Sequence, residues 1–179
     1  MLNFHKAELA DASLIAALIN SAYRGETSRK GWTTEADILD GLRTTTADIA
    51  AIIKQGLHAT SPKFIIVGEK NDEIISTICC EKHEDIAQLG MIAVKPTAQN
   101  KGHGKALIQA AETMTKREWR VAGYEMYVIS IRTELIAFYE RLGYELTKQV
   151  EKFPVNIEVW QPKVKDLTLV KLRKTLMSI

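Results

Sequence analysis

The sequence predicts a mixed α/β fold in one domain spanning residues 1–179, and three observations carry this prediction. A length of 179 residues suits one domain better than two, and no internal repeat or Pro/Gly-rich linker divides the chain. Helical periodicity marks the first third of the chain, whereas β-type runs mark the middle. A long amphipathic stretch then separates a strand ending at Val94 from one beginning at Glu125, which is the pattern of a helical crossover between strands.

The first expected helix follows Asp11, whose carboxylate suits an N-cap, and runs to about Ala22. Its spacing of apolar residues predicts one buried stripe. The stripe consists of Leu14, Ile15, Leu18 and Ile19.

A polar stretch, Tyr23–Trp32, follows this helix. Thr33 or Thr34 is suited to cap a second helix that ends near Leu42. A third, short helical piece is expected over Asp48–Gln55.

The middle of the chain has the composition of strands. Phe64–Val67 and Ile74–Ile78 are β-type runs, and Gly68–Asp72 between them predicts a hairpin turn. A third strand is expected over Ala87–Val94, and Pro96 ends it.

The second half begins with a long helix from Gly104 to about Val121, which Gly123 is expected to close. Apolar side chains recur in this helix at helical spacing. They are Leu107, Ile108, Ala111, Met114 and Trp119. The remaining expected elements are a strand over Glu125–Ile131, a helix over Thr133–Leu142 with Gly143 at its end, and strands over Tyr144–Phe153 and Asp166–Arg173.

Bulk properties narrow the function classes. The formal charge of +2, from 24 basic and 22 acidic residues, argues against a dedicated nucleic-acid surface. The N-terminus lacks the apolar region of a signal peptide, and the longest apolar stretch, Ala12–Ile19, is too short to span a bilayer. We therefore expect a cytoplasmic protein that does not bind membranes.

The two cysteines, Cys79 and Cys80, are adjacent in an expected strand, where neighbouring side chains point to opposite faces. A disulfide between them is therefore not expected, and reduced thiols fit a cytosolic protein. His83, Glu84 and Asp85 follow closely, but no second ligand pair accompanies this cluster, so no metal site is expected.

The segment Val94–Ala106 carries the strongest functional signal. Gly102 and Gly104 lack a Cβ, so the backbone there can turn freely and approach a ligand closely. The amides at the start of the following helix are unpaired and, with the helix dipole, attract an anion. Lys101 and Lys105 add positive charge. Together these features predict a phosphate or pyrophosphate site.

Two common nucleotide-binding patterns do not match this loop. A Walker A loop requires a glycine where Gln99 stands and a Ser or Thr where Ala106 stands. A dinucleotide fingerprint requires its first glycine directly after the strand and a small third residue, whereas Leu107 occupies that third position.

The loop instead resembles the Gln/Arg-x-x-Gly-x-Gly/Ala loop of the GNAT superfamily of N-acetyltransferases, with Gln99, Gly102 and Gly104 at the pattern positions. A second motif, Glu134–Tyr144, resembles the GNAT helix that follows the fifth strand. The resemblance covers about Phe64–Tyr144 and is looser outside it. It implies a GNAT-like mixed, mostly antiparallel central sheet of six or seven strands flanked by helices.

The resemblance also implies the donor, acetyl-CoA, with no metal, and direct attack of a primary amine on its thioester. Tyr139 matches the family tyrosine near the thioester sulfur and would assist the departing thiolate. Core packing is the alternative role of Tyr139, because it shares a stripe with Leu135 and Leu142. Arg132 stands where many relatives carry an asparagine that contacts the cofactor, and a solvated arginine is its alternative. The residues expected to bind the cofactor are Ile92, Ala93, Val94, Gln99, Asn100, Lys101, Gly102, His103, Gly104 and Lys105.

The general base stays open, although an alkyl amine near pKa 10.4 is only about 0.1% neutral near pH 7.4. Some relatives carry a glutamate on the fourth or fifth strand, but the matching residues here are Gln88 and Tyr127, neither of which is a carboxylate. The carboxylates available nearby are Glu81, Glu84, Asp85 and Glu125.

Acceptor recognition is expected from the stretch between the first two helices, together with Gln88 and Tyr127. Tyr23 and Trp32 would shape an apolar wall, while Glu26 or Glu35 would attract a cationic amine. A polar loop anchored on the core by Trp32 is the alternative. We expect a small-molecule amine as the acceptor; protein N-termini or lysines, and a non-catalytic acyl-CoA sensor, remain open, as does a homodimer.

Overall fold

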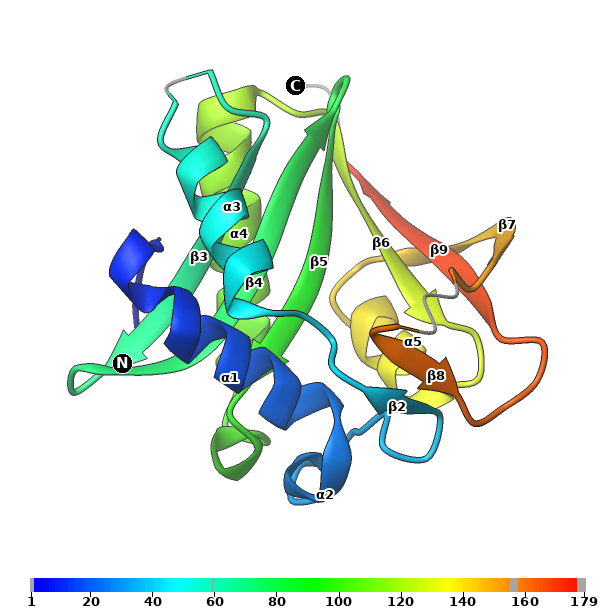
Figure 1. Ribbon diagram of the computed structural model, residues 1–179. Coiled ribbons are helices and arrows are strands. Elements are labelled where there is room, and N and C mark those ends of the chain that lie inside the picture. The colour runs from blue at the N-terminus through cyan, green and yellow to red at the C-terminus, as the bar shows by residue number, and fades with distance from the viewer. Residues whose placement is uncertain (1, 59, 155–157, 177–179) are drawn as a thin grey trace.

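The central feature of the fold is a seven-stranded sheet in the order β1-β3-β4-β5-β6-β9-β7 (Figure 1). The structure is a computed structural model and describes residues 2–58, 60–154 and 158–176. All neighbouring strands are antiparallel except β5 and β6. This confirms the expected mixed, mostly antiparallel sheet flanked by helices. The strands are β1 (Asn3–Lys6), β3 (Lys63–Lys70), β4 (Glu73–His83), β5 (Ile86–Val94), β6 (Gly123–Ile129), β7 (Glu145–Lys152) and β9 (Thr168–Thr175).

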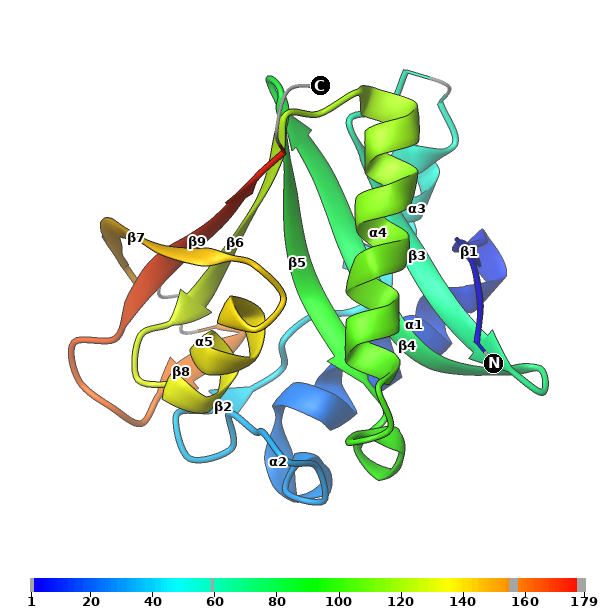
Figure 2. The same ribbon diagram turned by 180° about the vertical axis from the view of Figure 1, so that it is seen from behind.

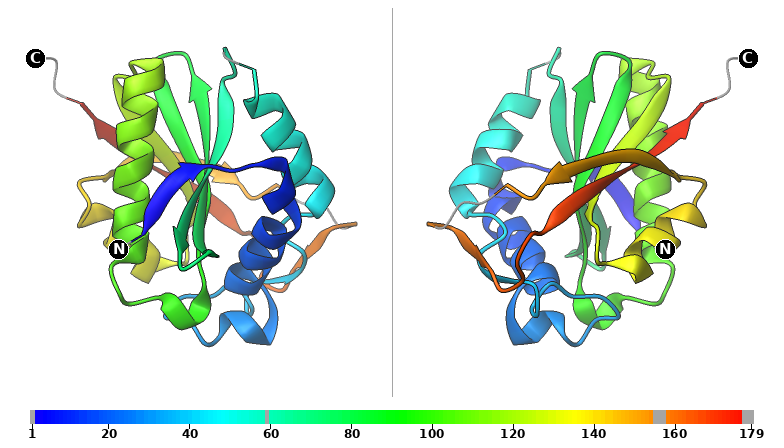
Figure 3. Two further views of the ribbon diagram at one scale, coloured as in Figure 1. Left: turned by 90° about the vertical axis from the view of Figure 1, so that its left-hand side faces the viewer. Right: turned by 90° about the vertical axis from the view of Figure 1, so that its right-hand side faces the viewer.

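Helices cover both faces of this sheet (Figure 3). The helices α1 (Ala12–Tyr23) and α3 (Thr46–Gly56) lie on one face, and α4 (His103–Trp119) lies on the other (Figures 1 and 2). The short helices α2 (Gly25–Ser28) and α5 (Thr133–Glu140) lie near the lower end of the sheet in these views. Strand β5, helix α4 and strand β6 form the predicted crossover.

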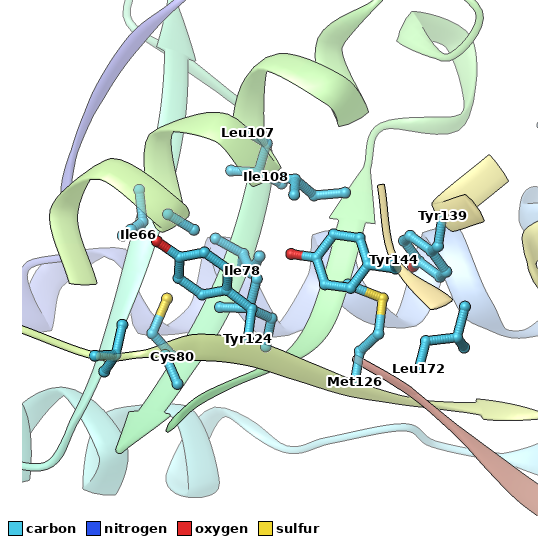
Figure 4. Packing of buried hydrophobic residues seen from close by; sticks show 14 of the residues in the cluster. Ile66, Ile78, Cys80, Leu107, Ile108, Tyr124, Met126, Tyr139, Tyr144 and Leu172 are labelled. Atoms are coloured by element: carbon cyan, nitrogen blue, oxygen red, sulfur yellow. The ribbon is translucent and has the colours of Figure 1, made fainter. Parts of the chain in front are cut away.

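The strands of the first half supply both cores because their side chains alternate between faces. In β3, Ile65 packs toward α1 and α3, whereas Ile66 packs toward α4. The adjacent Cys79 and Cys80 divide in the same way, and both are free and buried. Figure 4 shows the α4-side cluster, in which helix residues lie against side chains of several strands.

Turns follow from local chemistry. Asn71 and Asp72 join β3 to β4 with φ of 52° and 60°, the pair of positive angles that a tight two-residue hairpin requires. Helix α3 begins with a capping box in which Thr45 accepts from the Asp48 amide at 3.2 Å. Gly143 follows α5 with φ of 90°.

Several sequence predictions about the helices are wrong in detail. The Asp11 carboxylate does not cap α1 but accepts from the Glu8 amide at 2.8 Å, which fixes the preceding turn. Leu14 is 60% exposed, so the buried stripe of α1 excludes it. Arg120, with φ of 52°, rather than Gly123, ends α4, and Gly123 begins β6.

The predicted helix between Thr33 and Leu42 is also wrong. This segment contains turns and the strand β2 (Leu39–Gly41), which pairs with β8 (Trp160–Pro162) to form a second, two-stranded sheet. Leu39 is 1% exposed and packs with Ile129 and Leu167 in a third apolar cluster. Both partners of this small sheet, and β1, were absent from the sequence predictions.

Candidate active site

The site begins where the two central strands separate. Strands β5 and β6 are paired at only three positions, Ile86 with Gly123, Ala87 with Tyr124 and Gln88 with Glu125. Beyond this point the strands diverge, as Figures 1 and 2 show. Residues from both strands line a cavity there, so the divergence opens the middle of the sheet to ligands.

A bulge in β5 lies at the same place. Thr77 pairs with Ala93 and Cys79 pairs with Gly90, so β5 carries one residue more than β4 between these positions. Met91 has a φ of 46°, which is uncommon for a residue with a Cβ. A bulge of this kind bends the strand and turns its peptide groups away from the ladder. It therefore displaces peptide groups of β5 from the ladder with β4.

Two cavities flank this opening, and both are lined by Ile92 and Tyr139. The first has a volume of about 220 Å³ and is called here the donor groove, after the residues expected to bind the cofactor that line it. The second has a volume of about 480 Å³ and is called here the acceptor cavity, after the residues expected to bind the acceptor that line it.

The donor groove holds most of the predicted cofactor residues. It contains eight of the ten, together with Trp32, Leu135 and Phe138. Ala93 is outside it because its side chain packs in the core beside α1, and Lys101 is exposed and outside the lining. The eight are Ile92, Val94, Gln99, Asn100, Gly102, His103, Gly104 and Lys105.

The loop at the end of the groove has the geometry of an anion site. Gly102 has a φ of 78°, which favours glycine, and α4 begins at the next residue. The first hydrogen bond of the helix joins the Ala106 amide to the Gly102 carbonyl at 3.1 Å. The preceding helical amides, those of His103, Gly104 and Lys105, therefore have no partner within the helix and are available to an anion.

Gly104 matters because it has no side chain to fill the groove, and not because of its backbone angles. A Cβ there would lie 3.6 Å from Phe138 Cζ and 3.9 Å from Val94 Cγ2, which are ordinary contact distances. The position tolerates a Cβ within the protein, but larger side chains would project into the groove. Its glycine therefore keeps the groove open.

Gln99 has a structural task beside the groove. Its side chain donates to the Val94 carbonyl at 3.1 Å and accepts from the Trp32 amide at 2.9 Å. The Trp32 ring lies 5.8 Å from the Phe138 ring. Trp32 thus lines the donor groove, and not the acceptor cavity where it was expected.

The charge of the His103 imidazole depends on burial and on nearby lysines. Desolvation lowers the pKa of His103, and the positive charges of Lys70 and Lys101 lower it further. The imidazole is therefore mostly neutral at pH 7.

Tyr139 lies between the two cavities. Its side chain is 5% exposed, and its ring lies 5.3 Å from Phe138 and 6.3 Å from Tyr144. Burial raises the pKa of Tyr139 far above its usual range, and the nearby hydroxyl of Tyr23 adds to this rise. The phenol therefore stays protonated at neutral pH and can act only as a hydrogen-bond donor or acceptor.

Tyr23 forms part of the wall of the acceptor cavity. Its hydroxyl donates to the Ile92 carbonyl at 2.9 Å, and burial raises its pKa. This hydrogen bond links α1 to the bulged part of β5. Tyr23 is therefore held in place by the strand edge that borders both cavities.

The other predicted acceptor residues divide into two groups. Glu35, Gln88 and Tyr127 line the acceptor cavity. Glu26 does not, because its side chain is 89% exposed and pairs with Arg29 at 2.9 Å.

Glu35 is not available to attract a cationic amine. Its carboxylate accepts hydrogen bonds from Arg24 and, at 2.7 Å, from Arg132. All three side chains are 6% exposed. Arg132 also donates to Thr33 Oγ1 at 2.5 Å, so it is a buried ion-pair residue and not a solvated arginine. We call Arg24, Glu35 and Arg132 the buried triad.

The carboxylates considered as general bases lie elsewhere. Glu81 pairs with Lys63 at 2.7 Å, Glu125 pairs with Lys171 at 3.2 Å, and neither these two nor Glu84 and Asp85 line either cavity. Glu151 in β7 does line the acceptor cavity. No local sequence motif marks Glu151, because its place in the site depends on how β7 and β9 fold back.

Other residues of the acceptor cavity could also not be recognised from local sequence motifs. The apolar wall opposite α1 comes from the C-terminal part of the chain, where Phe153, Trp160 and Leu169 line the cavity. Trp160 belongs to the unpredicted strand β8 and donates from Nε1 to the Pro154 carbonyl at 3.0 Å.

Within the described ranges, no group of three or more His, Cys, Asp or Glu side chains is arranged to hold a metal ion. The described helices include none that is long and apolar enough to cross a membrane.

Comparison with known proteins agrees with this geometry. Residues 61–146 match the family model described as "Acetyltransferase (GNAT) domain". This segment is therefore similar to GNAT acetyltransferase domains, which are acyl-CoA-dependent acetyltransferases. No curated protein sequence matches the chain.

Solved structures share the fold over nearly the whole chain. The structure of yncA from Salmonella typhimurium, determined with its cofactor acetyl-CoA, is 17% identical with a TM-score of 0.71, and the match covers 99% of this chain and 95% of that one. The ribosomal-protein-S18-alanine N-acetyltransferase from Escherichia coli is 17% identical with a TM-score of 0.67, and the match covers 100% of this chain and 96% of that one. At these identities the similarity establishes the fold.

Proposed function

We propose that this protein transfers an acetyl group from acetyl-CoA to the primary amine of a small molecule. The observation that carries the proposal is the meeting of two cavities at Tyr139 and Ile92, with an open helix N-terminus at the end of one of them. One cavity is suited to the donor and the other to the acceptor, and the reacting atoms would meet between them.

The donor groove fits the parts of acetyl-CoA in order. The amides of His103, Gly104 and Lys105 suit the pyrophosphate, because they are unpaired donors at the positive end of a helix dipole. The β5 edge near Ile92 and Val94 suits the pantetheine arm, which would pair with free peptide groups as an added strand does. The thioester would then lie in the opening between β5 and β6, where peptide N–H groups can stabilise the oxyanion.

Tyr139 has properties that suit hydrogen bonding to the departing thiolate. A phenol of ordinary pKa near 10 would already be about 1.5 units too weak an acid to protonate a thiolate near 8.5, a cost of about 2 kcal/mol. Burial makes Tyr139 weaker still as an acid. We therefore assign it the role of a hydrogen-bond donor that stabilises the thiolate without losing its proton.

The amine must lose a proton before or during attack. Two carboxylates line the acceptor cavity, and Glu35 is already paired with two arginines. Glu151 has no ion pair with any residue in the described ranges, so we propose that it accepts this proton, directly or through water.

The test is release of coenzyme A thiol from acetyl-CoA in the presence of amines, amino acids and short peptides. Thiol release with small amines and the matching acetylated product by mass would support the proposal. Release with peptides alone would favour a protein acetyltransferase instead. Binding of acetyl-CoA without turnover across the panel would favour a non-catalytic acyl-CoA sensor.

A further inference from the structure

We propose that the acceptor carries a carboxylate beside its amine, as an amino acid does, and that Arg43 binds that carboxylate. This inference rests on the proposed function, because it names the substrate class of the acceptor cavity. It replaces the expectation that Glu26 or Glu35 would attract a purely cationic amine.

The charged side chains that line the acceptor cavity favour an acceptor that carries a carboxylate. Three arginines and two glutamates line it, so the lining has a net charge of +1. The buried triad accounts for two arginines and one glutamate and is itself net positive. The buried Nε atoms of Arg24 and Arg132 have no hydrogen-bond partner in the described ranges, and Arg132 Nε has a Glu134 carboxylate oxygen 3.7 Å away, outside the cavity lining. A polycationic amine would meet like charge in this cavity.

Arg43 is the arginine of the cavity lining that does not belong to the buried triad. No ion pair joins it to a carboxylate of the described residues, whereas Arg24 and Arg132 both pair with Glu35. Its side chain is partly buried and lies over the Tyr23 ring at 5.8 Å. Its backbone is fixed, since its amide donates to Asn20 Oδ1 at 2.7 Å. A guanidinium held in this way can bind a carboxylate through two parallel hydrogen bonds.

The remaining lining fits the other parts of an amino acid. Phe153, Trp160 and Leu169 offer an apolar surface for a side chain. The net positive lining also disfavours the ammonium form of a bound amine and so lowers its pKa, which helps to expose the nucleophile. Glu151 is then the carboxylate on which the ammonium group can rest before it loses its proton.

The experiment compares amines that differ only in the carboxylate. Leucine is compared with leucinamide and 3-methylbutylamine, phenylalanine with 2-phenylethylamine, and spermidine serves as the polycation. We expect kcat/KM with acetyl-CoA to be about 10- to 100-fold higher for the amino acid of each pair, the range of a charge-assisted hydrogen bond. Spermidine should be the poorest acceptor.

Variants assign the effect to one residue. Arg43→Gln should raise KM for the amino acids by about 10- to 100-fold and leave kcat/KM for 3-methylbutylamine within about threefold. Arg43→Lys should give an intermediate KM, because it keeps the charge and loses the planar fork. Arg117→Gln is the matched control: it removes one arginine whose side chain is 71% exposed and should change neither value.

The outcomes separate this inference from the proposed function. Turnover with amines but no preference for carboxylates, or an unchanged amino-acid KM in Arg43→Gln, would overturn the inference alone. Absence of turnover with every acceptor would overturn the proposed function and this inference with it.

Discussion

Tyr139 is packed between two aromatic rings and still borders both cavities, and this combination determines what the residue can do. The sequence offered core packing and contact with the thioester as alternatives for it, and the structure is compatible with both at once. A buried phenol is a poor acid but a well-positioned donor. Tyr144 provides the contrast, because its hydroxyl is bound to Glu112 at 2.8 Å, away from the cavities.

Substituting Tyr139 tests that role. We expect Tyr139→Phe to lower kcat by about 10- to 100-fold, because one hydrogen bond to a charged group is lost in the transition state. The dissociation constant for acetyl-CoA should stay within about twofold. Steady-state kinetics and calorimetry measure the two quantities, and Tyr144→Phe is the control that should keep kcat. Equal kcat in the Tyr139 variant would remove the residue from the chemistry.

Glu35 is the other residue whose role is determined by its environment. The sequence predicts a carboxylate that attracts a cationic amine, yet two arginines from different segments surround it. The contact with Arg132 ties the segment before β2 to the start of α5, the helix that carries Tyr139. Glu35 is thus a positioning residue.

Neutralising Glu35 should destabilise the fold. Glu35→Gln leaves the buried Arg24 guanidinium without its counter-charge and leaves Arg132 only the longer contact with Glu134 at 3.7 Å, which costs about 3–5 kcal/mol. Urea unfolding measures this as a lower free energy of unfolding. Glu26→Gln, which breaks an exposed pair with Arg29, should leave the unfolding midpoint nearly unchanged. Equal midpoints for the two variants would contradict the role of the buried triad.

At the scale of elements, strands and helices with strong local patterns were predictable. The β3–β4–β5 meander, α4 and α5 follow from β-type runs, helical spacing and glycine positions. These elements also carry the loop and Tyr139, so most of the lining of the donor groove lies in elements that could be predicted from the sequence, whereas Trp32 does not.

Elements that depend on distant partners were not predictable. Strand β2 is three residues long and is stabilised by β8, some 120 residues later. The threonines before it are suited to cap a helix, and they therefore led to the wrong prediction of a helix in this segment. The acceptor cavity depends on the same partners, since Trp160 and Phe153 line it. Arg43 and Glu151 also reach the cavity only through tertiary folding. The donor half of the site is therefore local in sequence, and the acceptor half is not.

The edge strand β1 offers an element-scale prediction about pH. His5 in β1 is paired with Glu69 in β3 at 3.0 Å, and this hydrogen bond raises the pKa of His5 above 6.5. The stability from this contact is fully present below pH 6.5 and is lost as pH rises through the folded-state pKa. The urea midpoint of the wild type, relative to that of His5→Gln, should therefore decrease as the pH rises from 6 to 8.5.

The control for this measurement is His58→Gln, at an exposed position after α3. It should leave the pH dependence of the midpoint as it is in the wild type. A His5→Gln variant whose midpoint keeps the wild-type pH dependence would show that the β1–β3 contact does not titrate.

At the scale of the whole molecule, the sheet consists of two halves joined by a short parallel contact. The pairing of β5 with β6 covers three positions, whereas β3–β4 and β6–β9 pair along most of their length. Each half also has its own antiparallel partners. This arrangement lets the sheet open at its centre without losing its core, and Ile92 and Tyr139 line both cavities at this opening.

We propose that this opening binds acetyl-CoA, and calorimetric titration of acetyl-CoA into the protein is the test. We expect saturable binding at one site in the wild type. We also expect a large loss of affinity in Gly104→Val, whose side chain would project into the donor groove toward Phe138 and Val94. Absence of binding in the wild type, or equal affinity in the variant, would contradict it.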